Sequence, residues 1–230
     1  EGGKLENSGD LNNNSSLKND GELENKGTVS NNENGNLENN GTIDNKENAE
    51  INNGGNFNNN AGSTLNNESG AEIGGNQPVS NGGDINNDGN IKTTVDNTED
   101  GRVDAEVTWT DKDGNEHSGS LKDVLEYLKE NPEEASGAKV ELNKDVEVTE
   151  PLEVPSGVEL SVPDGTKLEV KPEGTLDNNG TVSVGEGGSL DNNGTVNNNE
   201  GGKLENSGDL NNNSSLKNDG ELENKGTVSN

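Results

Sequence analysis

The chain has 230 residues, of which 22% are apolar and 1% are aromatic, and its formal net charge is −30. This composition alone predicts disorder, because burial of so few apolar side chains cannot offset the entropy of ordering the backbone. The charge argues against nucleic acid and membrane partners. No apolar run is long enough to span a bilayer, and the absence of cysteine excludes disulfides and thiolate metal sites.

A verbatim repeat links the beginning of the sequence to its end. Residues 1–31 recur without a change as residues 200–230, an offset of 199 residues. There is no methionine, and no signal-peptide pattern opens the sequence. We therefore expect an excised or processed piece of a longer chain, built from tandem copies with a period of 199 residues.

Residues 1–97 carry a strict apolar period, and we interpret them as the C-terminal part of one repeat. Successive apolar residues lie six or eight positions apart, a spacing that helices do not produce: Leu37, Ile43, Ile51, Phe57, Leu65, Ile73, Val79, Ile85 and Ile91. In most units a small residue precedes the apolar residue by two positions and an Asn follows it by two. Because strand side chains alternate, all three face one side. This predicts inward amides at Asn39, Asn45, Asn53 and Asn59.

Short strands with such short turns favour a coil over a hairpin sandwich. The turns consist of Asn, Gly, Asp, Ser and Lys, and Asn-Gly pairs at 34–35, 40–41, 179–180 and 193–194 suit left-handed or turn backbones. Three strands make a rung of about 20 residues, or about 22 to 24 where the longer spacings cluster, and rungs stack in parallel roughly 4.8 Å apart. The sequence predicts an all-β, three-sided parallel β-helix (β-solenoid), with right-handed winding favoured.

The inward asparagines explain how so polar a chain can fold. An amide both donates and accepts, so identical Asn side chains stacked along the coil satisfy one another from rung to rung. A buried Asn without such a partner would cost about 1–3 kcal/mol. We therefore predict continuous asparagine ladders in the interior.

Residues 98–137 interrupt the period and are interpreted as a junction, a β-hairpin and a capping helix. "AEVTWT-DKDG-NEHSGS" alternates around a turn and places Trp109 on the hairpin. "SLKDVLEYLKENPEEA" follows, with Ser120 as N-cap and Pro132 beyond the end of what we expect to be the one helix. The predicted cap residues are Trp109, Leu121, Val124, Leu125 and Leu128.

Residues 138–230 resume the period as the N-terminal part of the next repeat. Its first strands carry two apolar residues each, and Asn replaces the second from Asn178 onward. The predicted core residues are Leu176, Val182, Leu190, Val196, Leu204, Leu210, Leu216 and Leu222. The predicted ladder residues are Asn178, Asn192, Asn198, Asn206, Asn212, Asn218 and Asn224.

The segments "SLKDVLEYLKE", "VELNKDVEVTEPLEVPSGVELSVPDG" and "GTLDNNGTV" resemble the parallel β-helix repeat modules of Gram-positive, chiefly clostridial, cell-surface proteins. The resemblance covers about residues 105–198, and the rest reads as rung-like continuation. It implies an extracellular, adhesive or structural role, and it supplies no catalytic residues. The high Asn content and the scarcity of aromatic residues depart from that family.

Catalytic and metal-binding constellations are weak in this sequence. "DKDGNE" at 111–116 lacks the ligand spacing of a calcium loop and is interpreted as a hairpin turn, and His117 beside it as a solvated strand residue. A polysaccharide lyase would need clustered carboxylates, a base and sugar-stacking aromatics, and the three aromatic residues share no rung. We expect no enzyme, no catalytic residue, no cofactor and no specific metal site, although outward carboxylates could collect calcium diffusely.

These features predict a structural repeat of an extracellular or cell-surface filament. Its expected partners are further copies of itself, end to end along a fibre axis, and possible neighbours are other filaments or the cell surface. One alternative is the stalk of a surface adhesin whose binding site lies outside this region. Another is a disordered acidic spacer, which would show a coil-like circular dichroism spectrum and rapid proteolysis.

Overall fold

The computed structural model describes residues 2–98 and 100–230, so Glu1 of the verbatim repeat and Glu99 of the predicted junction lie outside the described residues. The chain forms two compact units. Unit 1 comprises the residues up to Ala105 together with His117–Asp123, and unit 2 comprises Glu106–Glu116 together with Val124–Asn230. The repeat boundaries at 97/98 and 137/138 remain predictions from the sequence period.

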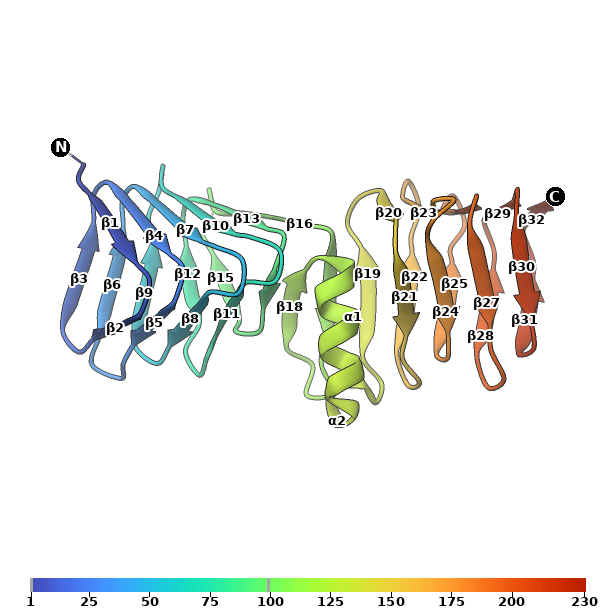
Figure 1. The fold of residues 1–230 in the computed structure, drawn as a ribbon, viewed down its shortest axis with the longest axis horizontal. Coiled ribbons are helices and arrows are strands. Elements are labelled where there is room, and N and C mark those ends of the chain that lie inside the picture. The colour runs from blue at the N-terminus through green and yellow to red at the C-terminus, as the bar shows by residue number, and fades with distance from the viewer. Residues whose placement is uncertain (1, 99) are drawn as a thin grey trace. The chain divides into compact units, whose positions relative to one another are not determined.

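Unit 1 is a parallel β-solenoid in which each strand pairs with the third strand before and after it (Figure 1). This connectivity gives three faces. The first face contains β1 (Lys4–Asn7), β4 (Glu22–Asn25), β7 (Thr42–Asn45), β10 (Thr64–Asn67), β13 (Asp84–Asn87) and β16 (Arg102–Ala105). The second contains β2 (Asp10–Asn13), β5 (Thr28–Asn31), β8 (Glu50–Asn53), β11 (Glu72–Gly75) and β14 (Asn90–Ile91). The third contains β3 (Ser16–Asn19), β6 (Asn36–Asn39), β9 (Asn56–Asn59), β12 (Val79–Asn81) and β15 (Val95–Asn97).

Unit 2 repeats this three-sided arrangement, drawn from yellow to red in Figure 1. Its first face contains β19 (Lys139–Leu142), β22 (Glu159–Val162), β25 (Thr181–Val184), β28 (Lys203–Asn206) and β31 (Glu221–Asn224). Its second contains β20 (Val146–Val148), β23 (Lys167–Val170), β26 (Ser189–Asn192), β29 (Asp209–Asn212) and β32 (Thr227–Ser229). Its third contains β21 (Pro151–Val154), β24 (Thr175–Asn178), β27 (Thr195–Asn198) and β30 (Ser215–Asn218). The predicted all-β parallel solenoid is therefore confirmed.

The register places like residues above one another. Leu23 pairs with Ile43 and Asn25 with Asn45, and the same match of apolar on apolar and Asn on Asn recurs through both units. Stacked asparagines are 18, 20 or 22 residues apart in sequence, and in one step, from Asn81 to Asn97, they are 16 apart. The 18-residue rungs, which extend the predicted range, arise where three six-residue spacings follow one another.

Each unit includes one antiparallel strand pair among its parallel strands. In unit 1, β14 pairs with β18 (Glu116–Gly119), and in unit 2, β19 pairs with β17 (Val107–Thr110). The turn between β17 and β18 is closed by Asp111, whose carboxylate accepts hydrogen bonds from the backbone N–H groups of Asp113 and Asn115 at 2.9 and 2.8 Å. The predicted turn at "DKDG" is confirmed.

Helix α1 (Leu121–Glu130) begins where the sequence predicted it. The Ser120 hydroxyl accepts the N–H of Asp123 at 3.1 Å, as an N-cap does. The expectation of a single helix is wrong, because Pro132 opens a second short helix, α2 (Pro132–Ala135), a position where its missing N–H costs nothing. All five predicted cap residues are buried, and the rings of Trp109 and Tyr127 lie 5.8 Å apart.

The Asn-Gly pairs were expected in left-handed or turn backbones, and they lie in turns without a left-handed φ at their glycines. Left-handed residues lie instead mainly in the longer turns, for example Gly62 and Gly201. At Gly41 the requirement is close stacking, since a Cβ atom there would lie 2.1 Å from the carbonyl oxygen of Gly21 in the neighbouring rung. Short turns therefore need glycine because consecutive rungs touch there, and not because of the φ angle.

The verbatim repeat provides a matched test of this close stacking. A Cβ atom on Gly208 would lie 2.3 Å from the carbonyl oxygens of Gly185 and Gly188, whereas one on the corresponding Gly9 would meet nothing within 4 Å. We expect Gly208→Ala to lower the free energy of unfolding by about 1–3 kcal/mol and Gly9→Ala to leave it unchanged or raise it slightly. Urea denaturation of both variants measures this, and equal effects would contradict the stacking explanation.

Candidate functional site

The interior of each solenoid is built around columns of asparagine. On the first face of unit 1 the Nδ2 of each amide donates to the Oδ1 of the Asn in the next rung, at 2.8 Å in every step. The column contains Asn7, Asn25, Asn45, Asn67 and Asn87. Asn87 closes it by donating to the carbonyl oxygen of Ser118 at 2.9 Å. Amide thus follows amide from β1 to β13, and Ala105 takes the next position, on β16.

Each ladder amide is also tied to the backbone. Asn25 Nδ2 donates a second hydrogen bond to the carbonyl oxygen of Glu50 in the following rung at 3.0 Å, and its Oδ1 accepts the N–H of Gly27 at 3.2 Å. Both amide hydrogens and both acceptor positions are used. The side chain therefore holds a corner of its own rung and two strands of the next rung in place.

The other faces carry the same ladders. In unit 1 one ladder joins Asn13, Asn31 and Asn53, and another joins Asn19, Asn39, Asn59, Asn81 and Asn97. In unit 2 the ladders join Asn178, Asn198 and Asn218, then Asn192, Asn212 and Asn230, and finally Asn206 and Asn224. Their N–O distances range from 2.6 to 2.8 Å. The predicted asparagine ladders are therefore present in both units.

Two interruptions show what the ladder requires. Gly75 replaces Asn on the second face of unit 1, and there Asn53 donates instead to the carbonyl oxygens of Gln77 and Pro78. In unit 2 Val184 precedes Asn206 in the column, and the buried Oδ1 of Asn206 has no hydrogen-bond partner among the described residues. When the residue one rung earlier in the column is apolar, the Oδ1 of the next Asn therefore has no side-chain amide to accept from.

The predicted residues fall into buried and exposed sets. Buried ladder residues are Asn39, Asn45, Asn53, Asn59, Asn178, Asn192, Asn198 and Asn206, whereas Asn212 is half-buried and Asn218 and Asn224 are exposed. Buried core residues are Leu176, Val182, Leu190, Val196, Leu204 and Leu210, whereas Leu216 is half-buried and Leu222 is exposed. The exposed members lie in the rung formed by β30, β31 and β32.

A second set of ladders lies on the outer surface, and the sequence analysis missed it. Asn66 Nδ2 donates to Asp44 Oδ1 at 2.7 Å, and Asn86 donates to Asn66 at 2.8 Å. Similar outer contacts start at Asp20, Glu153, Glu169, Asp177 and Asp191. These hydrogen bonds run from the later rung to the earlier one, opposite to the inner ladders. Where a carboxylate starts the contact it fixes this direction, because it can only accept; the outer pairs Asn32–Asn14 and Asn58–Asn36 run the same way without one.

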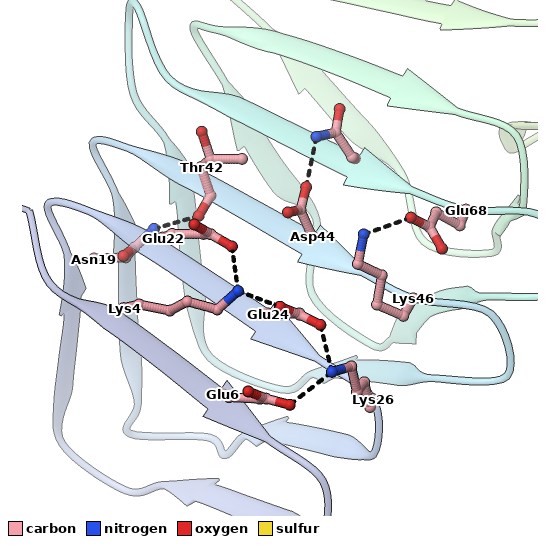
Figure 2. A network of polar contacts seen from close by, with 11 residues as sticks. Lys4, Glu6, Asn19, Glu22, Glu24, Lys26, Thr42, Asp44, Lys46 and Glu68 are labelled. Carbon is pink, nitrogen blue, oxygen red and sulfur yellow. Dashed lines mark hydrogen bonds and ion pairs between the residues drawn. The ribbon is translucent and has the colours of Figure 1, made fainter.

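Charged residues on the first face of unit 1 form a chain of ion pairs (Figure 2). The Lys4 ammonium contacts the carboxylates of Glu22 at 2.8 Å and Glu24 at 2.5 Å, and Lys26 contacts those of Glu24 at 2.5 Å and Glu6 at 2.6 Å. Hydrogen bonds from Lys26 and then Lys4 lower the pKa of Glu24 to about 2. The same contacts raise the pKa of Lys4 above its ordinary value.

No group among residues 2–98 and 100–230 offers three or more His, Asp or Glu side chains positioned to hold a metal ion. A groove of about 160 Å³ lies between α1 and the third face of unit 2, lined in part by Glu126, Lys129 and Asp177. It is smaller than ordinary ligand sites of about 300–1,000 Å³, and Lys129 is paired there with Glu153. Over the same described residues, neither α1 nor α2 has the length and apolarity of a membrane-crossing helix.

Comparison with known proteins supports the solenoid reading. The haemagglutinin repeat family model matches residues 140–230, which covers most of unit 2. No curated protein is significantly similar to the chain. The family match and the structure together agree on a β-helix repeat protein.

Replacement of one interior amide tests the ladder. In Asn45→Asp the carboxylate would face the Asn67 Oδ1 and the Glu72 carbonyl oxygen, to which Asn45 now donates at 2.8 and 3.0 Å. We expect a loss of about 3–5 kcal/mol in the free energy of unfolding, as for an uncompensated buried charge. The control is Asn52→Asp, which adds the same charge on the outward side of β8. Similar urea midpoints for the two variants would show that the interior amides are dispensable.

Titration tests the ion-pair chain. Because the pKa of Glu24 is lower in the folded protein than its ordinary value of 4.5, its stabilising contribution is complete above pH 4.5 and is lost as the pH falls through about 2. NMR titration of the Glu24 carboxyl should give an apparent pKa near 2, and Lys26→Ala should raise it. Lys225→Ala is the control, since it should raise the pKa of Glu223, the copy of Glu24, and leave Glu24 unchanged. An unshifted Glu24 would contradict the contacts in Figure 2.

Proposed function

We propose that this chain is a structural repeat of an extracellular filament, in which stacked β-solenoid units form a stiff and soluble rod. The observation that carries the proposal is the continuity of the inner ladders, each of which links two to five consecutive rungs. Cross-rung amides and parallel backbone pairing both act along the coil axis. A rod held in this way needs no thick apolar core.

The family match supports an extracellular and non-catalytic role. The haemagglutinin repeat model covers residues 140–230, where the outward residues are Thr, Ser, Lys, Asp, Glu and Asn, and the inward ones are Leu, Val and Asn. A haemagglutinin repeat is by name a part of a cell-agglutinating surface protein. We therefore place the chain outside the cell and assign it no catalytic residue and no cofactor.

The surface charge fits a filament that stays dispersed. The formal net charge is −30, and no Asp, Glu, Lys or Arg among the described residues is buried. Like charge keeps separate rods in solution, at the cost of repulsion between neighbouring rungs. Lysines such as Lys4, Lys26 and Lys171, each between two carboxylates, reduce that repulsion within a rod.

A second candidate function is the stalk of a surface adhesin whose binding site lies outside residues 1–230. The match to the haemagglutinin repeat family favours this function, because the family's name describes repeats of a protein that binds cells and agglutinates them. The solenoid would then hold a separate binding domain away from the cell. A compact, aromatic-rich domain attached to the native polypeptide would favour this function over a purely structural filament.

Fibre diffraction from oriented native filaments tests the proposal. We expect a strong reflection at about 4.8 Å along the filament axis, from strands stacked at the parallel spacing. We also expect resistance to proteolysis under native conditions. Diffraction without this axial spacing, together with a coil-like circular dichroism spectrum, would support the acidic-spacer alternative and overturn the proposed function.

A further inference from the structure

Asparagine followed by glycine is a pair at which a polypeptide readily modifies itself. The glycine nitrogen forms a bond with the side-chain carbonyl carbon of the asparagine. The bond from that carbon to Nδ2 breaks, and ammonia leaves with the proton of the glycine N–H. Water then opens the succinimide ring and leaves aspartate or isoaspartate. Glycine favours the ring closure because it has no side chain to hinder the approach.

The fold places the Asn-Gly pairs in three settings. Two pairs begin at buried residues of the inner ladders, three lie in short turns on the outer surface, and one lies in a longer turn. In that order, their asparagines are Asn53 and Asn81, then Asn40, Asn179 and Asn193, and finally Asn34.

The two buried pairs are held by the backbone as well as by the inner ladders. The N–H groups of Gly54 and Gly82 each donate to a backbone carbonyl oxygen of the preceding rung at 2.7 Å. Asn53 and Asn81 are themselves 0% exposed. Ring closure at either pair therefore requires separation of two rungs.

The amide of Asn40 is held from both sides by the outer ladder. Its Nδ2 donates to Asp20 Oδ1 at 2.9 Å, and its Oδ1 accepts the Nδ2 of Asn60 at 2.7 Å. These partners belong to the preceding and the following rung. Because ring closure turns the side-chain carbonyl carbon toward the nitrogen of Gly41, both hydrogen bonds must break first.

The other two short-turn pairs are held in the same way. Asn179 donates to Glu153 Oε1 at 2.8 Å and accepts from Asn199 Nδ2 at 2.9 Å. Asn193 donates to a carboxylate of the preceding rung at 3.2 Å and accepts from an amide of the following rung at 3.1 Å. In all three pairs the amide is therefore fixed between two rungs.

Asn34 lacks such a restraint. It lies in the turn 32–35 between β5 and β6, whereas the turns at the same corner of the adjacent rungs, 14–15 and 54–55, are two residues shorter. Asn34 thus has no aligned counterpart in either rung, and its exposed side chain makes no hydrogen bond with residues 2–98 or 100–230. An exposed side chain changes rotamer within picoseconds to nanoseconds, so its carbonyl carbon samples the approach to the next nitrogen freely.

Neither exposure nor the glycine nitrogen distinguishes Asn34 from Asn40. Both side chains are exposed to water. The N–H of Gly35 donates to the Asn32 carbonyl oxygen at 2.6 Å, and the N–H of Gly41 donates to an Oδ1 atom of its own turn at 3.3 Å. Each of these bonds lies within one turn and opens without separation of rungs. The difference between the two pairs is the restraint on the amide.

We propose that Asn34 is a site at which the folded chain deamidates, and that the outer ladders protect Asn40, Asn179 and Asn193 from the same reaction. The product adds a negative charge to an exposed turn that already contains the exposed Glu33. The outer ladders thereby gain a role beyond holding rungs together, since they shield the pairs that are chemically most labile. This inference does not depend on the proposed filament.

Ageing of the folded 230-residue chain at neutral pH, followed by tryptic digestion and tandem mass spectrometry, measures each site. Residues 27–46 form one tryptic peptide, so each digest compares Asn34 with Asn40 directly. We expect Asn34 to react faster by about tenfold or more, a factor that corresponds to about 1.4 kcal/mol, because two hydrogen bonds must break before Asn40 can react. In urea the two rates should become similar. Equal rates in the folded chain, or an unmodified Asn34, would overturn the proposed site.

Two matched variants test the protection. Asn60→Ala removes the amide that donates to Asn40, and Asn199→Ala removes the amide that donates to Asn179. Each variant should accelerate deamidation several-fold at its own partner and leave the other site at the parent rate. Circular dichroism verifies that both variants keep the β-sheet spectrum of the parent chain. Acceleration of both sites in one variant would contradict a local protection.

A double variant removes both restraints on one amide. Asp20→Ala combined with Asn60→Ala leaves Asn40 without either outer-ladder partner. We expect the deamidation rate of Asn40 to approach that of Asn34 in the same peptide, while Asn179 keeps the parent rate and so reports an intact fold. An unchanged rate at Asn40 would overturn the protective role of the outer ladders.

Discussion

The hydrogen bond from one asparagine amide to the next is the interaction on which the rest of the structure depends. A thin coil with few apolar residues can bury polar side chains only if each is fully paired, and the amide meets this condition because it donates and accepts along one axis. The contacts of Asn25 to Asn7, Asn45, Gly27 and the Glu50 carbonyl oxygen show the complete pattern. A ladder of this kind is cooperative, because each rung completes the pairing of its neighbours.

Direction is a consequence of this pairing. Inner amides donate toward the later rung, whereas outer amides such as Asn66 and Asn86 donate toward the earlier rung and start from a carboxylate. Where Asp or Glu starts an outer ladder, the carboxylate fixes its direction because it can only accept. The solenoid is therefore chemically polar, which gives a filament built from it two different ends.

The sequence period was sufficient to predict the strands, the inward positions and the three-sided coil, because spacings of six and eight place apolar residues and Asn in register. It also predicted the N-cap at Ser120. It placed Gly41 in a turn but did not show that rung-to-rung contact, and not a left-handed φ, requires glycine there, and it gave no sign of α2. The outer ladders were missed because Asp44 and Asn66 become neighbours only when rungs of unequal length are aligned. The exposure of Leu222 depends on which rung covers it, and no local pattern encodes that.

Hydrogen exchange of the asparagine side-chain amides tests the central claim most directly. NMR should show the Nδ2 protons of Asn45 and Asn67, which bond to the next rung, exchanging far more slowly than those of Asn52 on the outward side of β8. Slow exchange confined to the inward amides is the predicted result. Exchange of Asn45 and Asn67 at the rate of Asn52 would contradict a ladder-stabilised interior.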